Sequence, residues 1–201
     1  MIRDMHATEE PPFTPDLLRA AYAQGFFPMP HPQTGEILWF NPDPRAVIPL
    51  DGFHVSRSLR RTLRRVPFEV TFDRDFHGVM AACADREETW ITQDFMDSYG
   101  DLHRQGDAHS VEVWLGGRLV GGAYGVSLAG GFFAESMFHR VTDASKVALY
   151  HLVERLRARG MTLLEVQFMT DHLASLGAVL VPRAEYLRRL RQALRQPVRF
   201  A

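Results

Sequence analysis

The stretch HSVEVWLGGRLVGGAYGVSL, residues 109–128, decides the fold class. Over 109–115, valine and leucine alternate with serine, glutamate and tryptophan, and this period of two predicts a strand. Gly116-Gly117 is typical of a hairpin turn, so a second strand follows, interrupted by glycines. A further turn at 129–131 leads to a third strand. These segments together predict an antiparallel meander.

Helical patterns lie on both sides of the meander. The clearest is 143–159, where apolar residues line one face and charged residues the other. Before the meander we expect helices over 14–22, 56–65, 75–84 and 92–105 and a strand over 68–72; after it we expect a strand over 162–168, a short helix over 171–176, a last strand segment and a basic helix from Ala184.

Residues 26–51 hold six of the twelve prolines and are interpreted as an ordered loop region, because they are too apolar for a free linker. The mixed order of elements predicts an α+β fold with a mostly antiparallel sheet. We expect a small N-terminal subdomain with a basic helix at 1–70 and a larger domain at 71–201.

The composition excludes several classes of protein. A net charge of −1 gives no general signal for a polyanionic partner. The longest apolar runs are far shorter than the roughly 20 residues of a membrane span, and the N-terminus has no secretory pattern. Cys83 is the only cysteine, which excludes an intrachain disulfide and is interpreted as a small buried residue. We expect a cytoplasmic monomer that does not bind membranes.

One glutamate interrupts the apolar third strand, in GGFFAESMFHR at 130–140. Period-2 alternation places Phe133, Glu135 and Met137 on the same side. A buried charge without a partner is costly, so either this face is wet or Glu135 binds something. The alternatives are a salt bridge to Arg140 and an ammonium ligand held beside an apolar pocket. The neighbours able to build such a pocket are Phe132, Phe133, Met137 and Leu149.

The helix predicted at 56–65 is strongly basic. Leu59 and Leu63 lie four apart and can pack inward. The arginines of this segment are Arg57, Arg60, Arg61, Arg64 and Arg65, and all except Arg60 share one broad face. Arginines on one helix face can contact phosphates, although a solvated basic face is the usual explanation of such a run.

Eight motifs follow one another along the chain: AYAQGFFPM (21–29), WFNPDPRAV (39–47), HVSRSLRR (54–61), TWIT (89–92), GDAHSVEVW (106–114), LVGGAYGV (119–126), ESMFHRVTDASKVAL (135–149) and HLASLGA (172–178). In this order they resemble the motifs of the leucyl/phenylalanyl-tRNA–protein transferase family. The resemblance covers about residues 18–190. It implies a catalytic domain with a GNAT-like acyltransferase fold and a small N-terminal domain.

The resemblance also implies an activity. Such an enzyme moves Leu, Phe or Met from aminoacyl-tRNA to the N-terminal Arg or Lys of a protein, which creates a degradation signal of the N-degron pathway. Aminolysis of an ester needs proton transfer and stabilisation of an oxyanion, but no covalent nucleophile, metal or cofactor. The scattered histidines and the single cysteine show no metal-binding spacing.

The resemblance assigns roles to individual residues. Glu135 corresponds to an aminoacyl-binding glutamate, and Glu165 and Gln167 to a catalytic Asp-x-Gln pair on one side of a strand. Glu165 replaces the family's aspartate, which moves the carboxylate by about one methylene. The alternative for this pair is a polar strand end facing solvent. The arginines of 56–65 correspond to a surface for the tRNA acceptor stem.

Further positions correspond to the aminoacyl-adenosine site. Met29 stands where the family often has a tryptophan that stacks on adenine, and Thr170 where it often has asparagine. Trp90 matches a family tryptophan, or is a core residue after a loop. Tyr22, Tyr99 and Ser145 also match.

Three other functions compete with this one. An acyl-CoA N-acyltransferase would share the fold, but HRVTDASKVAL lacks the glycines that hold a pyrophosphate before a helix. A non-catalytic tRNA- or degron-binding module would retain the basic helix. A transferase with the same donor could use N-terminal Asp or Glu acceptors, because the catalytic strand departs from the family pattern.

Overall fold

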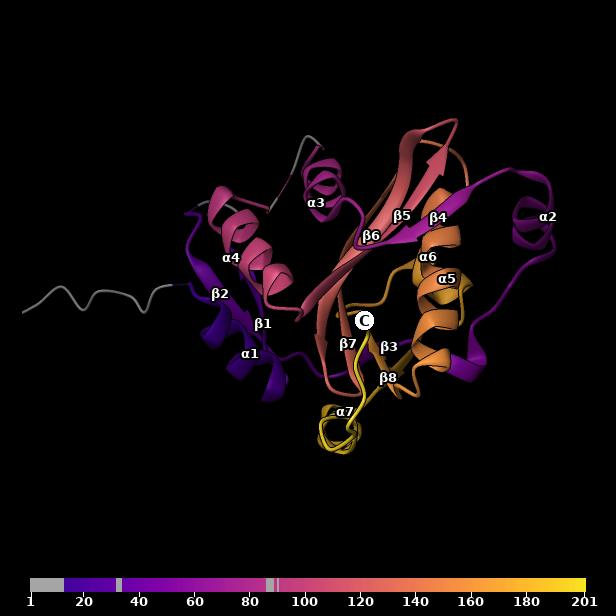
Figure 1. Cartoon of the computed structure of the whole chain (residues 1–201). Helices are drawn as coiled ribbons and strands as arrows, with labels where there is room; N and C mark the ends of the chain where they lie inside the picture. Colours follow the sequence, from indigo (N-terminus) through magenta and orange to yellow (C-terminus); the bar gives the residue numbers. More distant parts are fainter. Residues whose placement is uncertain (1–12, 32–33, 86–88, 90) are drawn as a thin grey trace, which may run out of the picture.

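The computed structural model describes residues 13–31, 34–85, 89 and 91–201. Its main feature is a seven-stranded sheet with the order β4-β5-β6-β7-β8-β3-β9 (Figure 1). Neighbouring strands run antiparallel except β7 and β8, which are parallel. The strands are β3 (Arg45–Val47), β4 (Glu69–Phe72), β5 (Ala108–Leu115), β6 (Arg118–Leu128), β7 (Gly131–His139), β8 (Leu163–Glu165) and β9 (Val179–Val181). The predicted α+β fold and the predicted meander, β5 to β7, are confirmed.

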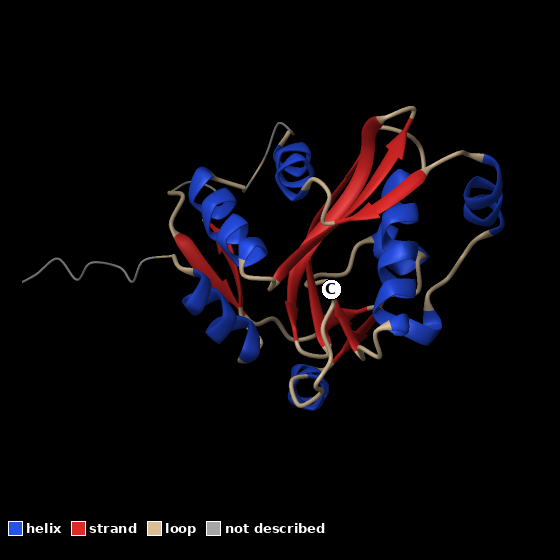
Figure 2. Ribbon diagram, in the orientation of Figure 1, coloured by secondary structure: helices blue, strands red, loops and turns tan. Residues whose placement is uncertain are grey.

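Helices cover both faces of the large sheet (Figure 2). α3 (Phe76–Ala84) and α4 (Gln93–Arg104) pack on one face, and α5 (Ala144–Ala158) packs on the other. Each face has its own apolar core, with Phe133 in the first and Phe132 in the second. The start of α5 approaches β6 so closely that a Cβ at Gly121 would collide with Ala144. This contact explains one of the glycines that interrupt β6 without ending it.

The N-terminal elements form a small layer beside α4. α1 (Pro15–Ala23) begins after Thr14, whose hydroxyl accepts a hydrogen bond from the Leu17 N–H. A two-stranded ribbon follows, with β1 (Phe27–Pro30) antiparallel to β2 (Ile37–Phe40). α1 packs against α4, and the two helices lie side by side in Figure 1.

The interpretation of residues 26–51 as a loop region was wrong. The segment contains β1, β2, β3 and a 3₁₀ turn, η1 (Leu50–Gly52). Strands of three or four residues are too short to show a period, and prolines are tolerated on the edges of a two-stranded ribbon. The division at residue 70 stays a prediction. β3 lies wholly before residue 71 and β4 crosses this boundary, and both are strands of the large sheet.

The other predicted helices form close to their predicted bounds. α2 (Arg57–Arg65) begins after Ser56, whose hydroxyl accepts a hydrogen bond from the Leu59 N–H at 3.1 Å. α6 (Asp171–Ser175) and α7 (Arg183–Ala193) follow β8 and β9. In the described part of the chain, no helix is long and apolar enough to span a membrane.

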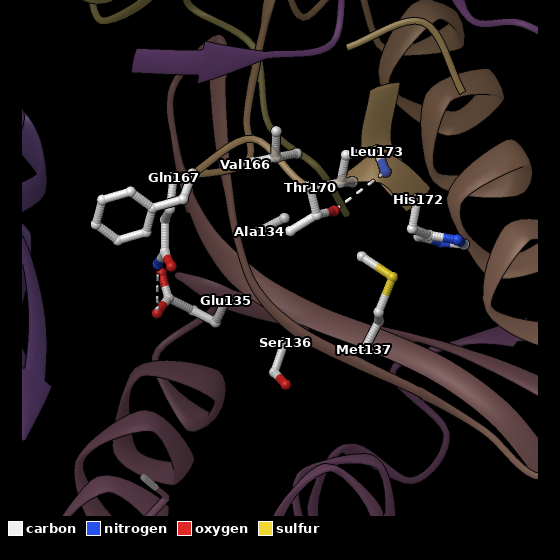
Figure 3. A pocket seen from close by; sticks show the side chains of 10 residues that line it. Ala134, Glu135, Ser136, Met137, Val166, Gln167, Thr170, His172 and Leu173 are labelled. Carbon is white, nitrogen blue, oxygen red and sulfur yellow. Dashed lines mark hydrogen bonds between the residues drawn. The ribbon is translucent and has the colours of Figure 1, made fainter. Parts of the chain in front are cut away.

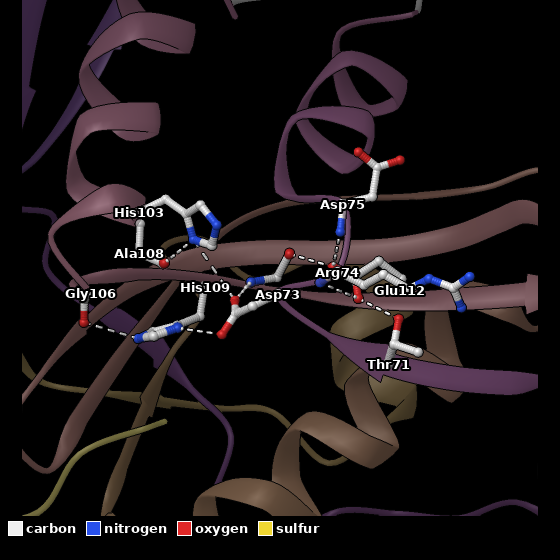
Figure 4. A network of polar contacts seen from close by, with 10 residues as sticks. Thr71, Asp73, Arg74, Asp75, His103, Gly106, Ala108, His109 and Glu112 are labelled. Atoms are coloured by element: carbon white, nitrogen blue, oxygen red, sulfur yellow. Dashed lines mark hydrogen bonds and ion pairs between the residues drawn. The ribbon is translucent and has the colours of Figure 1, made fainter.

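A buried polar network ties β4 and the turn after it to β5 (Figure 4). The Glu112 carboxylate is fully buried and accepts hydrogen bonds from the hydroxyls of Thr71 and Ser110. Nearby, Asp73 pairs with His109 at 2.8 Å and accepts from the Ser110 N–H at 3.0 Å. Because each carboxylate has several partners inside this network, we treat it as structural.

Candidate active site

A cavity of about 320 Å³ opens where β7 and β8 diverge (Figure 3). The two strands pair from Gly131 opposite Leu163 to Phe133 opposite Glu165, and no further. Beyond this point their continuations separate and form the two walls. The lining residues are Ala134, Glu135, Ser136, Met137, Val166, Gln167, Phe168, Thr170, His172 and Leu173. The cavity is therefore an apolar hollow with a few polar groups, which is typical of a small-ligand site.

A β-bulge places Glu135 at this cavity. The register passes from Gly125 opposite Ala134 to Tyr124 opposite Ser136, so Glu135 is the extra residue on β7. A Cβ at Gly125 would collide with the Phe133 carbonyl oxygen, and only glycine fits opposite the bulge. The bulge also overturns the predicted alternation: Phe133 belongs to the first core, whereas Met137 packs against the second.

Three donors surround the Glu135 carboxylate, which is only 7% exposed. The Tyr22 hydroxyl donates to Oε1 at 2.6 Å. The Tyr99 hydroxyl and the Gln167 amide donate to Oε2 at 3.3 and 3.1 Å. The two tyrosine hydroxyls also lie 2.5 Å apart. The alternative role of Glu135, a salt bridge to Arg140, does not occur, because Arg140 pairs with Asp85.

Burial changes the acidity of this cluster. Burial raises the pKa of Glu135 to about 8; hydrogen bonds from Tyr22, Gln167 and Tyr99 oppose this rise, and the nearby charge of Glu165 adds to it. Burial, with the charge of Glu135, also holds the pKa of both Tyr22 and Tyr99 well above the usual range. The tyrosines therefore stay protonated as donors, while Glu135 can gain or lose a proton near neutral pH.

The second wall begins where β8 ends. The predicted strand over 162–168 is too long, because β8 stops at Glu165 and Gln167 has a φ of 63°. The expectation that Glu165 and Gln167 share one strand side was therefore wrong. Glu165 turns back instead, and its Oε1 accepts the Gln167 N–H at 2.7 Å. This contact stabilises the left-handed backbone conformation of Gln167, which is uncommon for a residue other than glycine. It also directs the Gln167 side-chain amide toward Glu135.

A buried arginine holds this turn in place. Arg45 is 1% exposed, and its Nη1 donates to Glu165 Oε1 at 2.9 Å. Its Nη2 reaches Asn41 Oδ1 at 3.1 Å and the Gly25 carbonyl. The guanidinium carbon lies 4.4 Å from the ring centre of Tyr186. Glu165 is fully buried, so the predicted alternative of a solvent-facing polar pair is excluded for it.

The geometry combines a buried carboxylate, an amide and an apolar hollow. A carboxylate in such a place can bind an ammonium group, while the hollow takes an apolar side chain. The amide can orient a second reactant. This arrangement suits positioning and electrostatic stabilisation rather than covalent catalysis.

Comparison with known proteins identifies the family. Residues 47–191 match the family profile described as leucyl/phenylalanyl-tRNA protein transferase, and residues 12–43 match the profile of its N-terminal domain. The chain belongs to the leucyl/phenylalanyl-tRNA protein transferase family.

Individual relatives agree with this assignment. The leucyl/phenylalanyl-tRNA–protein transferase of Herpetosiphon aurantiacus is 56% identical over 188 residues, which cover 93% of this chain and 97% of that protein. The transferase of Ruegeria pomeroyi is 54% identical over 188 residues, covering 93% and 90%. Among solved structures, FemX aligns with a TM-score of 0.53 at 13% identity, over 83% of this chain and 66% of that one. This likeness concerns the fold alone, and the predicted GNAT-like fold is confirmed.

The structure brings together only part of the predicted transferase site. Glu135, Gln167, Met137 and Thr170 line the cavity, and Tyr22 and Tyr99 bond to Glu135. Phe132, Phe133 and Leu149, which we expected in the pocket wall, are fully buried in the two cores and lie outside the lining. Ser145 is buried in the first turn of α5, and Met29 packs against the first core on β1. Trp90 lies outside the described residues.

The predicted transferase residues also omit some that the structure places at the site. Phe168 and His172 line the cavity, and Arg45 supports it from behind. The available signal for Arg45 was its position in RAVIPL, where a charge precedes an apolar run. This signal does not indicate which carboxylate Arg45 pairs with.

The five arginines of α2 form a separate surface. All are exposed and together line a shallow hollow of about 230 Å³. Leu59 is buried beneath them, and Thr62 donates to Asp143 at the start of α5 at 3.0 Å. Among the described residues, none of these arginines has an ion pair, so their charges face solvent together.

Proposed function

We propose that this chain transfers leucine or phenylalanine, and also methionine, from aminoacyl-tRNA to the N-terminal amino group of a protein. The observation on which this rests is the buried Glu135 carboxylate at the wall of an apolar cavity, with Gln167 beside it. Family membership supports the donor and the reaction. The exposed arginines of α2 form a positively charged surface, which suits the negatively charged phosphates of a tRNA acceptor stem.

Each site residue has a role in this reaction. Glu135 binds the α-ammonium group of the donor, and the hollow beside Met137 takes its side chain. The neutral acceptor amine attacks the ester carbonyl carbon, a C–N bond forms, and the bond to the ribose oxygen breaks, while the proton that the amine loses passes to that oxygen, which leaves as a hydroxyl. Gln167, whose Nε2 donates to Glu135, uses its amide oxygen to orient the attacking amine. Glu165 acts through the Gln167 backbone, whose N–H it binds.

The acceptors in this proposal are proteins that begin with Arg or Lys. Addition of a large apolar residue then creates an N-degron for degradation. Charged tRNA is a cytoplasmic substrate, so we place the reaction in the cytoplasm and assign it to a monomer.

The test is transfer of radiolabelled Leu and Phe from charged tRNA to peptides that begin with Arg, Lys, Asp or Ala. Acetyl-CoA serves as the control donor. We expect labelling of the Arg and Lys peptides only, and none from acetyl-CoA. Labelling of the Asp peptide alone would mean a different acceptor class, and no labelling from tRNA would contradict the proposal.

A further inference from the structure

The proposed reaction brings two cationic groups to one site: the donor's α-ammonium group and the acceptor's Arg or Lys side chain. Each needs an opposite charge. Glu135 is the only carboxylate among the described residues that line the cavity between β7 and β8. Since Glu135 is assigned to the donor, the acceptor needs a carboxylate nearby.

A second hollow of about 350 Å³ adjoins the first. It is lined by Ala82, Asp85, Met137, Phe138, His139 and Arg140, so Met137 belongs to both walls. Met137 lies two residues beyond Glu135 on β7, a rise of about 7 Å along a strand. Asp85, which follows α3, is the one carboxylate among the described lining residues of this second hollow.

The second hollow already holds a guanidinium group. Arg140 Nη2 lies 3.6 Å from Asp85 Oδ2, and the Arg140 guanidinium carbon lies 5.6 Å from the ring centre of Phe138. A hollow lined by both a carboxylate and an aromatic ring is a suitable environment for a guanidinium or ammonium group. Both charged side chains are largely exposed, 78% for Asp85 and 55% for Arg140, so the pair is weak and can exchange.

We propose that Asp85 is a specificity-determining residue that binds the cationic side chain of the acceptor's first residue, and that Arg140 occupies this position in the free enzyme. The inference rests on the proposed function, because it assigns a subsite of the same reaction. On binding, the acceptor's guanidinium or ammonium replaces Arg140 against Asp85 and Phe138. Asp85 does not line the cavity assigned to the donor.

The experiment measures steady-state transfer from Leu-tRNA to peptides that begin with Arg or Lys. Asp85→Asn removes the charge and preserves the shape, and we expect the KM for these peptides to rise about five-fold. The KM for Leu-tRNA stays within about two-fold. Arg140→Ala removes the internal competitor and lowers the peptide KM. Asp85→Arg should disfavour Arg peptides further and increase labelling of a peptide that begins with Glu.

Asp51 provides a matched control. It is 94% exposed and pairs with Arg157 at 3.6 Å, the same length as the Asp85–Arg140 pair, and it lines neither hollow. Asp51→Asn should leave the peptide KM unchanged. If wild-type enzyme labels Arg and Lys peptides but Asp85→Asn has the wild-type peptide KM, the inference fails while the proposed function stands. If wild-type enzyme labels neither peptide, the proposed function fails and this inference fails with it.

Discussion

At the scale of single residues, the site depends on how a buried carboxylate is compensated. Burying an unpaired charge would cost several kcal/mol, and Glu135 lowers this cost with three hydrogen bonds and a raised pKa. An ammonium ligand would complete the compensation. In the free site, Glu135 can therefore release its proton and bind an ammonium group instead.

This exchange predicts a pH dependence for donor binding. Glu135 has a pKa of about 8, so below pH 8 a proton must leave before the carboxylate can bind the donor's ammonium group. The KM for Leu-tRNA should therefore fall as pH rises from 6 to 8. It should rise again above pH 8, where the donor's amino group, with an ordinary pKa of about 7.7–8.0, loses its charge.

Glu135→Gln supplies the comparison. This variant cannot ionise, so its KM for Leu-tRNA should be at least about ten-fold higher at pH 8 and flat between pH 6 and 7.5. Steady-state kinetics at fixed, saturating peptide measures both profiles. A wild-type KM that does not change between pH 6 and 8 would contradict the role of Glu135.

The buried pair of Arg45 and Glu165 leads to a second prediction. Arg45→Met leaves Glu165 as an uncompensated buried charge and should lower the free energy of unfolding by about 3–5 kcal/mol. Adding Glu165→Leu removes that charge and should restore most of the stability. Transfer should stay low, because the Gln167 N–H has lost its acceptor. Urea unfolding and kcat separate the two effects; recovery of kcat together with stability would show that Arg45 is only structural.

At the scale of elements, the regular parts of the fold could be predicted and the irregular parts could not. The alternation over 109–115 and the amphipathic pattern over 143–159 led to β5 and α5. The bulge at Glu135 depends on the register between two strands, which no single strand's pattern reveals. The left-handed Gln167 depends on a side chain two residues earlier, and β8 was therefore predicted too long.

The candidate site could be predicted only as far as its motifs extend. Glu135, Gln167, Tyr22 and Tyr99 come from segments far apart in the chain, and the family resemblance grouped them before any geometry was known. Phe132 was expected in the pocket because it is near Glu135 in sequence. It contacts Phe200 in the core instead, at 5.3 Å between ring centres, because side chains alternate across a strand.

The α2 surface predicts a loss that depends on tRNA. Arg61→Glu combined with Arg64→Glu should raise the KM for Leu-tRNA by about ten-fold or more and lower the slope of log KM against log salt by about two. A short leucyl-adenosine donor lacks the acceptor stem, so its kcat/KM should not change. Arg191→Glu with Arg195→Glu is the control, because it makes the same charge change at exposed positions in and after α7. Equal effects of both double variants would mean a general charge effect.

At the scale of the whole molecule, the sheet joins segments from the N-terminal, middle and C-terminal parts of the chain. β3 lies between β8 and β9, and Arg45 at its start contacts Gly25, Glu165 and Tyr186. β3 and β8, which are neighbours near one edge of the sheet, thus position the Gln167 turn. Stability of the sheet and geometry of the site are therefore linked.

The network at the other end of the sheet predicts an acid sensitivity. Burial favours a raised pKa for Asp73, but hydrogen bonds from His109 and the Ser110 N–H, together with the His109 charge, lower it. A carboxyl with a lowered folded-state pKa contributes stability above its unfolded pKa, about 3.9, and this stability is lost as pH falls through the folded value. Asp73→Asn should therefore cost more stability at pH 7 than at pH 2. Urea unfolding at both pH values tests this; an equal cost at both would contradict it.

The most direct test of the account is a comparison of catalysis and tRNA binding in Gln167→Ala. We predict that kcat for transfer of Leu to an Arg peptide falls by at least about 100-fold, while the Kd for tRNA stays within about two-fold of wild type, because Gln167 and the α2 arginines line separate hollows with no residue in common. A wild-type kcat would mean that the cavity between β7 and β8 is not the reaction centre.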